Sequence, residues 1–112
     1  MKRLLAVAGL ALVVTLAGCT GAASLPDRDP EAVGTADAVV TEGAETRVSF
    51  VPDAGYEYFE GTTFVLTDDI TVTGAVDTAA DITDGDRIQV WSTICAESFP
   101  VRCQVEAVEV LD

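Results

Sequence analysis

The 112-residue chain contains no histidine, and its only lysine is Lys2. Histidine is the commonest general base and metal ligand in proteins, so Ser-His-Asp and Cys-His catalysis and the usual zinc sites are excluded. Aromatic residues make up only 6% of the chain, with a single tryptophan. These absences favour a binding or accessory role, and we expect no enzyme activity.

Positive charge is also scarce, because 6 Lys and Arg residues stand against 19 Asp and Glu residues and the formal net charge is −13. Beyond residue 18 the cations are Arg28, Arg47, Arg87 and Arg102. An acidic surface of this kind repels phosphate backbones, which bind proteins through Lys and Arg. Nucleic acid is therefore excluded as a partner, while salt adaptation and an acidic binding surface both stay open as explanations.

The N-terminal segment has the pattern of an export signal. Lys2 and Arg3 precede an uncharged, mostly aliphatic run of 13 residues, Leu4 to Leu16. A helix needs about 20 residues to cross the hydrocarbon core of a bilayer, so this run is too short to be a transmembrane helix. Its length is typical of the apolar region of a signal peptide.

The run ends in Leu16-Ala17-Gly18-Cys19, which resembles the lipobox of prokaryotic lipoproteins. The resemblance implies that Cys19 carries a diacylglyceryl group, that residues 1–18 are removed as a signal peptide, and that membrane lipid is a partner. It also implies a lipid-anchored location at the cell membrane or envelope, outside the cytoplasm. The alternative is an ordinary secretory signal in which Cys19 is an incidental thiol.

Cys95 and Cys103 are the remaining cysteine pair if Cys19 is lipidated. An exported compartment permits disulfides, and an even remainder favours a Cys95–Cys103 bridge over two free thiols. The spacing is not that of a CxxC redox motif, because seven residues separate the two cysteines. Such a bridge would connect the last two strands of the domain.

The rest of the chain divides into a tether and one domain. Residues 19–35 are rich in small residues, proline and charge, which predicts a flexible tether. Residues 36–112 contain short runs of alternating apolar and polar side chains between turn signals, which is typical of β-strands. No window of ten or more residues has a helical period, although Thr78–Ile82 fits one helical turn. A one-residue slip of the alternation within residues 103–111 predicts a β-bulge.

These patterns predict an all-β domain, a small Greek-key, OB-like β-barrel of five or six short strands, because closing the sheet removes exposed edges. The stretches "DITDGDRIQVW" and "ESFPVRCQVEAVEVL", within residues 77–111, resemble the closing strands of OB-fold-like domains in small secreted proteins of unknown function. The resemblance implies a fold and does not imply an activity.

Four carboxylates, those of Asp77, Asp81, Asp84 and Asp86, crowd one predicted loop. Ca²⁺ binds about six to eight oxygen ligands, so a calcium site is one interpretation of the loop. The spacing is not that of an EF-hand, and Asp84-Gly85-Asp86 also suits a solvated turn before a strand. We favour the turn, with no cofactor, and keep Ca²⁺ as the alternative.

Asp68 and Asp69, with Glu57 and Glu60 nearby in sequence, are a remote candidate for a carboxylate-dependent hydrolase. A glycoside hydrolase needs two carboxylates about 5–9 Å apart across a cleft. Proximity in sequence does not establish that arrangement, and acidic residues at such positions normally mark a turn.

Trp91, Tyr56 and Tyr58 are candidates for a binding face, since exposed aromatic side chains are common in binding sites. By alternation Trp91 points away from the side of its strand that carries Ile88, Val90 and Ile94, which we expect to face the core. The interpretation we favour is that Trp91 packs under the Tyr56–Phe59 loop or beside the disulfide, because large aromatic residues are buried on average.

The sequence as a whole predicts a membrane-anchored extracytoplasmic lipoprotein that acts as a non-catalytic binding or accessory module of the cell envelope. Its partner would be an envelope protein or a small ligand. A calcium-binding or calcium-stabilised envelope protein is the alternative, and a small hydrolase is a remote one.

Overall fold

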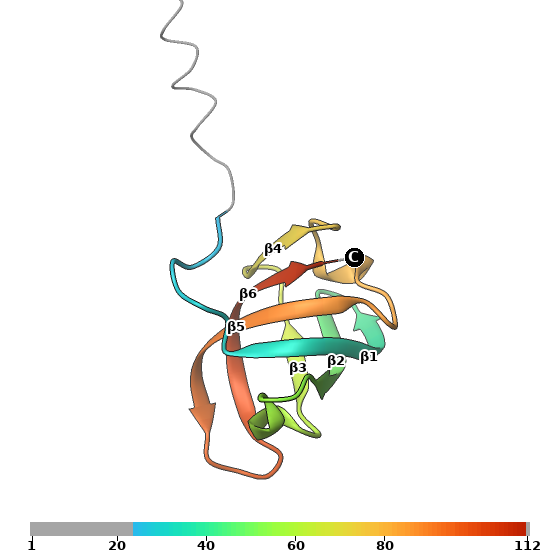
Figure 1. Cartoon of the computed structure of the whole chain (residues 1–112). Coiled ribbons are helices and arrows are strands. Elements are labelled where there is room, and N and C mark those ends of the chain that lie inside the picture. Colours follow the sequence, from blue (N-terminus) through green and yellow to red (C-terminus); the bar gives the residue numbers. More distant parts are fainter. Residues whose placement is uncertain (1–23, 112) are drawn as a thin grey trace, which may run out of the picture.

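The computed structural model describes residues 24–111, which fold around one six-stranded sheet (Figure 1). Two short 3-10 helices lie in the connections, η1 (Glu57–Phe59) and η2 (Ala79–Asp81). The all-β prediction is confirmed, and η2 falls within the helical turn that the sequence predicts. The strands are β1 (Ala32–Glu42), β2 (Glu45–Pro52), β3 (Thr63–Leu66), β4 (Thr71–Gly74), β5 (Arg87–Ala96) and β6 (Arg102–Val110).

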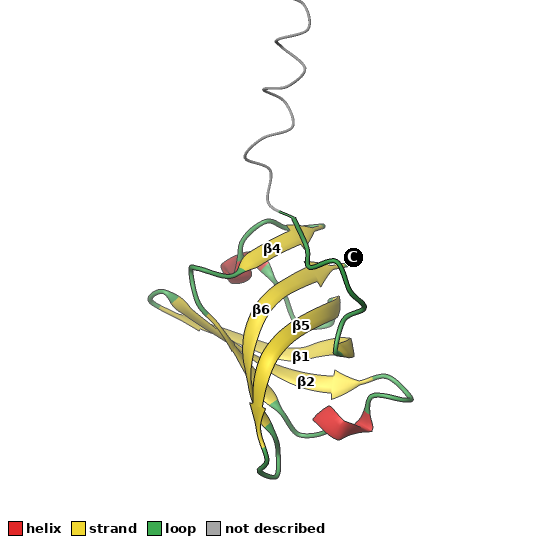
Figure 2. Cartoon of the chain, turned by 90° about the vertical axis from the view of Figure 1, so that its left-hand side faces the viewer, coloured by secondary structure: helices red, strands yellow, loops and turns green. Residues whose placement is uncertain are grey.

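The strand order in the sheet is β3-β2-β1-β5-β6-β4. Neighbouring strands are antiparallel except β4 and β6, which run parallel with Thr71 opposite Ala107. The sheet curls strongly, as Figure 2 shows, and Cα atoms of β3 come within 8 Å of Cα atoms of β6. The two ends of the strand order therefore bend toward each other.

The predicted closed barrel is wrong, because no ladder of hydrogen bonds joins β3 to β6 among residues 24–111. β4 pairs with the edge of β6 over residues 107–110, so this part of β6 cannot pair with β3. β3 is only four residues long and pairs with β2 alone. A seam between β3 and residues 102–106 of β6 is left without backbone pairing.

One face of the curled sheet encloses the hydrophobic core. Phe50 of β2 and Phe64 of β3 meet edge to face, with ring centroids 5.1 Å apart. Full burial of an aliphatic or aromatic side chain contributes about 1.5–3 kcal/mol to the free energy of unfolding, so the buried apolar side chains of the strands are the main source of stability. Along β2, β3, β5 and β6 the alternating apolar side chains are buried: Val48 and Phe50, Phe64 and Leu66, Ile88 and Val90, Val108 and Val110.

Two bulges change which side chains face the core. In β6, Val105 is the partner of Ser92 while Ala107 is the partner of Trp91, so Glu106 is an extra residue and the predicted bulge is confirmed. In β1 the register shifts between Ala36 and Ala38, after which Val39 packs against the core and Val40 is exposed. Because side chains alternate along a strand, one inserted residue exchanges the two faces.

The predicted boundary between tether and domain, after residue 35, is wrong because the domain begins earlier in the chain. β1 begins at Ala32, and the backbone N–H of Glu31 already donates to the carbonyl of Val90 over 3.0 Å. Gly34, which composition assigns to the tether, lies where β1 passes close to β2, and a Cβ there would stand 2.2 Å from the carbonyl oxygen of Val51. This glycine is a packing requirement of the sheet and not a mark of flexibility. Residues 1–18 and 19–23 of the predicted signal peptide and tether lie outside the described residues.

Candidate functional site

The β5–β6 hairpin contains the disulfide that the cysteine count predicts, and that prediction is confirmed. Cys95 and Cys103 are direct partners in the register, their sulfur atoms are bonded, and their Cα atoms lie 3.9 Å apart. Ala96 and Arg102 form the last residue pair of the hairpin before the turn. We name residues 96–102 the hairpin loop; its Phe99–Pro100 peptide bond is cis.

Contacts on the inner side attach the hairpin loop to the domain. Val101 is only 6% exposed and belongs to the core. The Thr62 hydroxyl donates a hydrogen bond to the carbonyl of Val101 over 3.1 Å. Within the loop, the Ser98 N–H donates to the Ala96 carbonyl over 2.8 Å, and the Ser98 hydroxyl donates to the Pro100 carbonyl over 3.0 Å. The disulfide, the buried valine and these hydrogen bonds all restrain the backbone of the hairpin loop.

The outer side of the same end of the molecule presents apolar side chains to solvent. Phe99 in the hairpin loop is 94% exposed and Ile94 at the end of β5 is 67% exposed. The loop and η1 lie at the same end of the sheet in both views (Figures 1 and 2), and Tyr58 of η1 is also exposed. Exposed apolar side chains at one end of a small domain are candidates for an interaction site.

A groove of about 320 Å³ lies between β3 and the start of β6, along the seam that the sheet leaves open. Two of the arginines, Arg47 and Arg102, line it. Arg47 pairs with Glu45 over 3.0 Å, whereas Arg102 has no acidic partner among residues 24–111. The other lining residues are Gly61, Thr63, Val65, Pro100, Val101 and Cys103. The groove therefore combines an apolar floor with positive charge beside the hairpin loop.

Trp91 does not form an exposed binding face, and that hypothesis is wrong for this residue. The side chain is 4% exposed, and its Nε1 donates a hydrogen bond to the carbonyl of Arg28 over 2.7 Å. The sequence favours a buried Trp91, packed under the Tyr56–Phe59 loop or beside the disulfide. The indole N–H instead donates to a carbonyl of the predicted tether, that of Arg28. Tyr56 is half-buried at the start of η1, which leaves Tyr58 as the exposed member of the predicted set.

The segment that covers Trp91 is fastened by ion pairs. Arg28 contacts Glu31 over 3.1 Å and Glu106 over 2.9 Å, and it also donates to the carbonyl of Ser92. These hydrogen bonds raise the pKa of Arg28. Partial burial opposes ionisation of Glu31, but hydrogen bonds from Arg28 and from the Ser92 N–H outweigh it and lower the pKa of Glu31. We name residues 28–31 the N-terminal strap.

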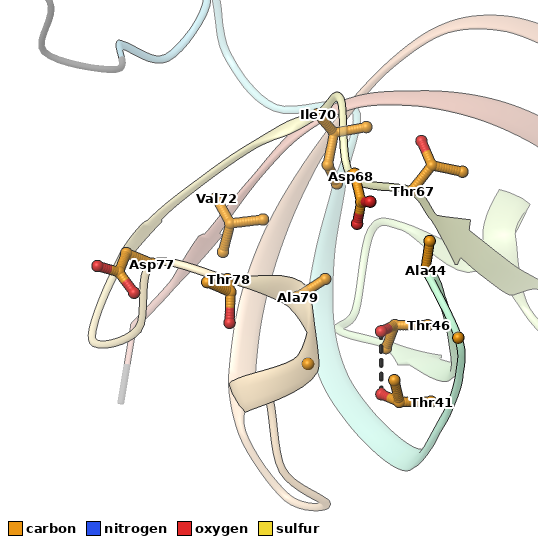
Figure 3. A pocket seen from close by; sticks show the side chains of 12 residues that line it. Thr41, Ala44, Thr46, Thr67, Asp68, Ile70, Val72, Asp77, Thr78 and Ala79 are labelled. Atoms are coloured by element: carbon orange, nitrogen blue, oxygen red, sulfur yellow. Dashed lines mark hydrogen bonds between the residues drawn. The ribbon is translucent and has the colours of Figure 1, made fainter.

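At the other end of the sheet a pocket of about 240 Å³ lies between the β1–β2 turn and η2 (Figure 3). Thr41 and Thr46 share a hydrogen bond of 3.0 Å in its wall. Asp68 and Asp77 both line the pocket, but Figure 3 shows Asp77 pointing away from its middle. The structure therefore does not aim these two carboxylates at one point, as a pair of acidic catalytic groups would require.

The acidic residues of the hydrolase hypothesis lie in two separate hollows: Asp68 and Asp69 line one with Glu45, and Glu57 and Glu60 line another beside Phe50. The carboxylate of Asp69 accepts a hydrogen bond from the hydroxyl of Thr67, its neighbour in the turn after β3. Glu57 accepts the Gly55 N–H through both oxygens, and this bond lowers the pKa of Glu57. A general acid needs a raised pKa, so Glu57 is shifted in the opposite direction. Glu60 follows η1 and is exposed.

The acidic loop, residues 77–86, is ordered by hydrogen bonds to its own carboxylates. Asp81 accepts the Thr78 hydroxyl, and Asp86 accepts both the N–H and the hydroxyl of Thr83. Asp84 reaches across to the N–H of Val39 over 2.8 Å. Within the described part of the chain, no three His, Cys, Asp or Glu side chains form a group that could hold a metal ion. The predicted turn accounts for these residues, and calcium binding stays an untested prediction.

Sequence reasoning missed the residues that matter most at the hairpin end. Phe99 and Ile94 were not singled out, and Ile94 was assigned to the inward face of its strand. The register irregularity between Ser92 and Cys95 turns Ile94 outward instead. The sequence feature that could have identified Phe99 is its position between the two bridged cysteines and next to Pro100, which predicts a turn.

Comparison with known proteins gives no family model, no curated protein and no solved structure that matches this chain. Cys19, the predicted lipidation site, lies outside the described residues. Among residues 24–111 no helix is long and apolar enough to cross a membrane.

Proposed function

We propose that this protein is a non-catalytic binding module of the cell envelope, anchored through lipid on Cys19, that contacts a partner through the hairpin loop. The observation that carries the proposal is the combination of a fixed loop backbone with side chains left free, above all Phe99 at 94% exposure. A preformed loop avoids much of the entropy lost on binding, which is why rigid loops make good interaction sites.

The position of the loop agrees with an N-terminal anchor. The described chain starts at the end of the domain opposite the hairpin loop, in both Figure 1 and Figure 2. A domain attached to a bilayer through its N-terminal segment would direct that loop away from the membrane. Two acyl chains give a far more stable attachment than one, so a diacylated cysteine would suffice as the anchor.

The anchor is tested by expressing the full chain in a bacterium and measuring the mass of its N-terminal peptide. We expect a peptide that starts at Cys19 and carries the diacylglyceryl mass. The Cys19→Ser variant should leave the membrane fraction, with Cys95 and Cys103 still bridged as the internal control. An unmodified Cys19 thiol in a released protein would overturn the anchor and leave an ordinary secretory signal.

Binding is tested with a photo-crosslinking amino acid introduced in place of Phe99 in living cells. We expect one discrete adduct from position 99. The matched control is the same amino acid in place of Val40, which is 54% exposed on β1. Equal adducts from both positions, or none from position 99, would argue against the hairpin loop as the contact site.

A further inference from the structure

At the tip of the hairpin loop, two residues with free side chains stand on either side of one whose side chain is hydrogen-bonded to the loop. Ser98 turns its side chain back onto the loop, because its hydroxyl donates to the Pro100 carbonyl over 3.0 Å. Glu97 and Phe99, on either side of Ser98, are exposed. The carboxylate of Glu97 makes no hydrogen bond or ion pair with residues 24–111. The loop therefore offers a free acidic side chain and a free aromatic one, separated by one residue.

We propose that this loop inhibits a serine endopeptidase that cleaves after acidic residues, by entering its active-site cleft with the Glu97–Ser98 peptide bond at the reacting centre. The proposal rests on the binding role of the hairpin loop and names the partner of that site. An endopeptidase cleft accepts a short exposed segment that projects from a protein body, and Figure 2 shows the hairpin loop projecting beyond the end of the sheet.

The geometry selects the Glu97–Ser98 bond over its neighbours. The primary pocket of such an enzyme takes the side chain that precedes the cleaved bond, and Glu97 is free to enter it. Ser98 is engaged with Pro100, so the Ser98–Phe99 bond would offer an occupied side chain. The Phe99–Pro100 bond ends at an imide nitrogen, which is a poor position for most endopeptidases. With Glu97 in the primary pocket, Phe99 would lie on the leaving-group side against an apolar surface.

The chemistry explains why such a loop inhibits and is not simply digested. The enzyme's serine oxygen bonds to the Glu97 carbonyl carbon, its proton passes through the enzyme's base to the Ser98 nitrogen, and the Glu97–Ser98 bond breaks. The new Ser98 amine stays in place, because the Cys95–Cys103 bridge and the buried Val101 hold its side of the loop. Attack by this amine on the acyl carbon reforms the peptide bond and returns the proton and the free serine. A tethered amine has a high effective concentration, so re-formation competes with hydrolysis by water.

The charge of the molecule agrees with the proposed enzyme class. A pocket that selects an acidic side chain is lined by cationic groups or hydrogen-bond donors, which complement the carboxylate of Glu97. The net charge of −13 would also favour approach of a cationic cleft. A second copy of this chain is a poorer occupant, because both surfaces would carry the same strong negative charge.

The test is an inhibition assay with the full oxidised chain against a glutamate-selective serine endopeptidase, with trypsin as the comparison enzyme. We expect the wild-type protein to inhibit the first enzyme and not trypsin. The Glu97→Lys variant should reverse this preference, with inhibition of trypsin stronger by about a hundredfold or more, because a like charge in the primary pocket is strongly disfavoured. Asp37→Lys makes a matched charge change on exposed β1 and should leave both results unchanged.

A second readout follows the loop itself by mass spectrometry. Prolonged incubation with the glutamate-selective enzyme should leave a mixture of intact chain and chain cut only between Glu97 and Ser98, joined by the disulfide. Rapid and complete cleavage of the loop, or no inhibition by either the wild-type or the Glu97→Lys protein, would overturn the inhibitor proposal. A crosslink from position 99 to an envelope protein that is not a peptidase would overturn the inhibitor proposal but leave the binding role in place. If neither inhibition nor a crosslink is found, both proposals are wrong.

Discussion

The hairpin loop and the acidic loop are ordered by opposite means. In the acidic loop, residues 77–86, the carboxylates of Asp81, Asp84 and Asp86 accept hydrogen bonds from the loop's own turns and from β1. The hairpin loop is held by a disulfide and by buried Val101, and the side chains of Glu97 and Phe99 are left free. A dense cluster of charge can therefore use its side chains to hold its own turns, whereas a loop held by other contacts keeps its exposed side chains available.

Removal of the disulfide should have the largest effect. The variant with Cys95→Ser and Cys103→Ser together should lose about 2–3 kcal/mol of unfolding free energy, because a nine-residue closed loop no longer restricts the unfolded chain. Chemical denaturation followed through Trp91 fluorescence measures this loss. The wild-type protein under reducing conditions should unfold at the same denaturant concentration as the variant. An unchanged midpoint in both samples would mean that the bridge does not stabilise the folded protein.

Truncation of the buried valine should have the next largest effect. Val101→Ala should lower the unfolding free energy by about 1–2 kcal/mol, because two buried methyl groups are lost and a small cavity remains. Val40→Ala is the matched control, since Val40 is 54% exposed, and it should change stability by less than about 0.5 kcal/mol. Equal losses in the two variants would remove the distinction between a core-anchored loop and a merely bridged one.

Acidification should weaken the sheet at positions outside the hairpin loop. Hydrogen bonds from Arg87 lower the pKa of Asp53, and the strap lowers the pKa of Glu31. A lowered folded-state pKa adds stability that is present above the unfolded value and lost as the pH falls through the folded value. We therefore expect the melting temperature to fall as the pH drops below about 4, the usual range for carboxyl groups.

Two variants check that assignment. Asp53→Asn should flatten the acid limb of the stability profile. Asp37→Asn should not, because the Asp37 side chain is exposed and makes no hydrogen bond within the described residues. An acid limb that is identical in the wild-type protein and in Asp53→Asn would contradict the proposed contribution of the Arg87 pair.

Addition of calcium should have the smallest effect. Because no three acidic side chains of residues 24–111 form a group that could hold a metal ion, Ca²⁺ should leave the melting temperature unchanged at matched ionic strength. A ligand present at about 100 times its Kd would add about 2.7 kcal/mol, which is a shift of several degrees for a domain of this size. A shift of that size, lost on chelation and in the variant Asp84→Asn, would make the acidic loop a metal site and reverse the comparison of the two loops.

The strap shows how far composition can mislead. Residues 28–31, Arg-Asp-Pro-Glu, have the charged, proline-containing character of a linker, yet Arg28 contacts Ser92 and Glu106, which are 64 and 78 positions away in sequence. The same contacts bury the face of the sheet that carries Trp91. No local pattern around Arg28 encodes a partner so distant, so neither the strap nor the burial of Trp91 beneath it was predictable.

The sequence by itself determined the elements whose causes are local. Alternation of side chains along each strand predicts the all-β class and the inward rows, a slip in that alternation predicts the bulge in β6, and an even pair of cysteines predicts the bridge. Only the tertiary structure decided whether the sheet closes into a barrel and which side chains are exposed to solvent. Whether β3 reaches β6, whether Ile94 turns outward and which loop keeps its side chains free depend on contacts between segments far apart in the chain. Those contacts follow from the curl of the whole sheet and from the competition of β4 for the edge of β6.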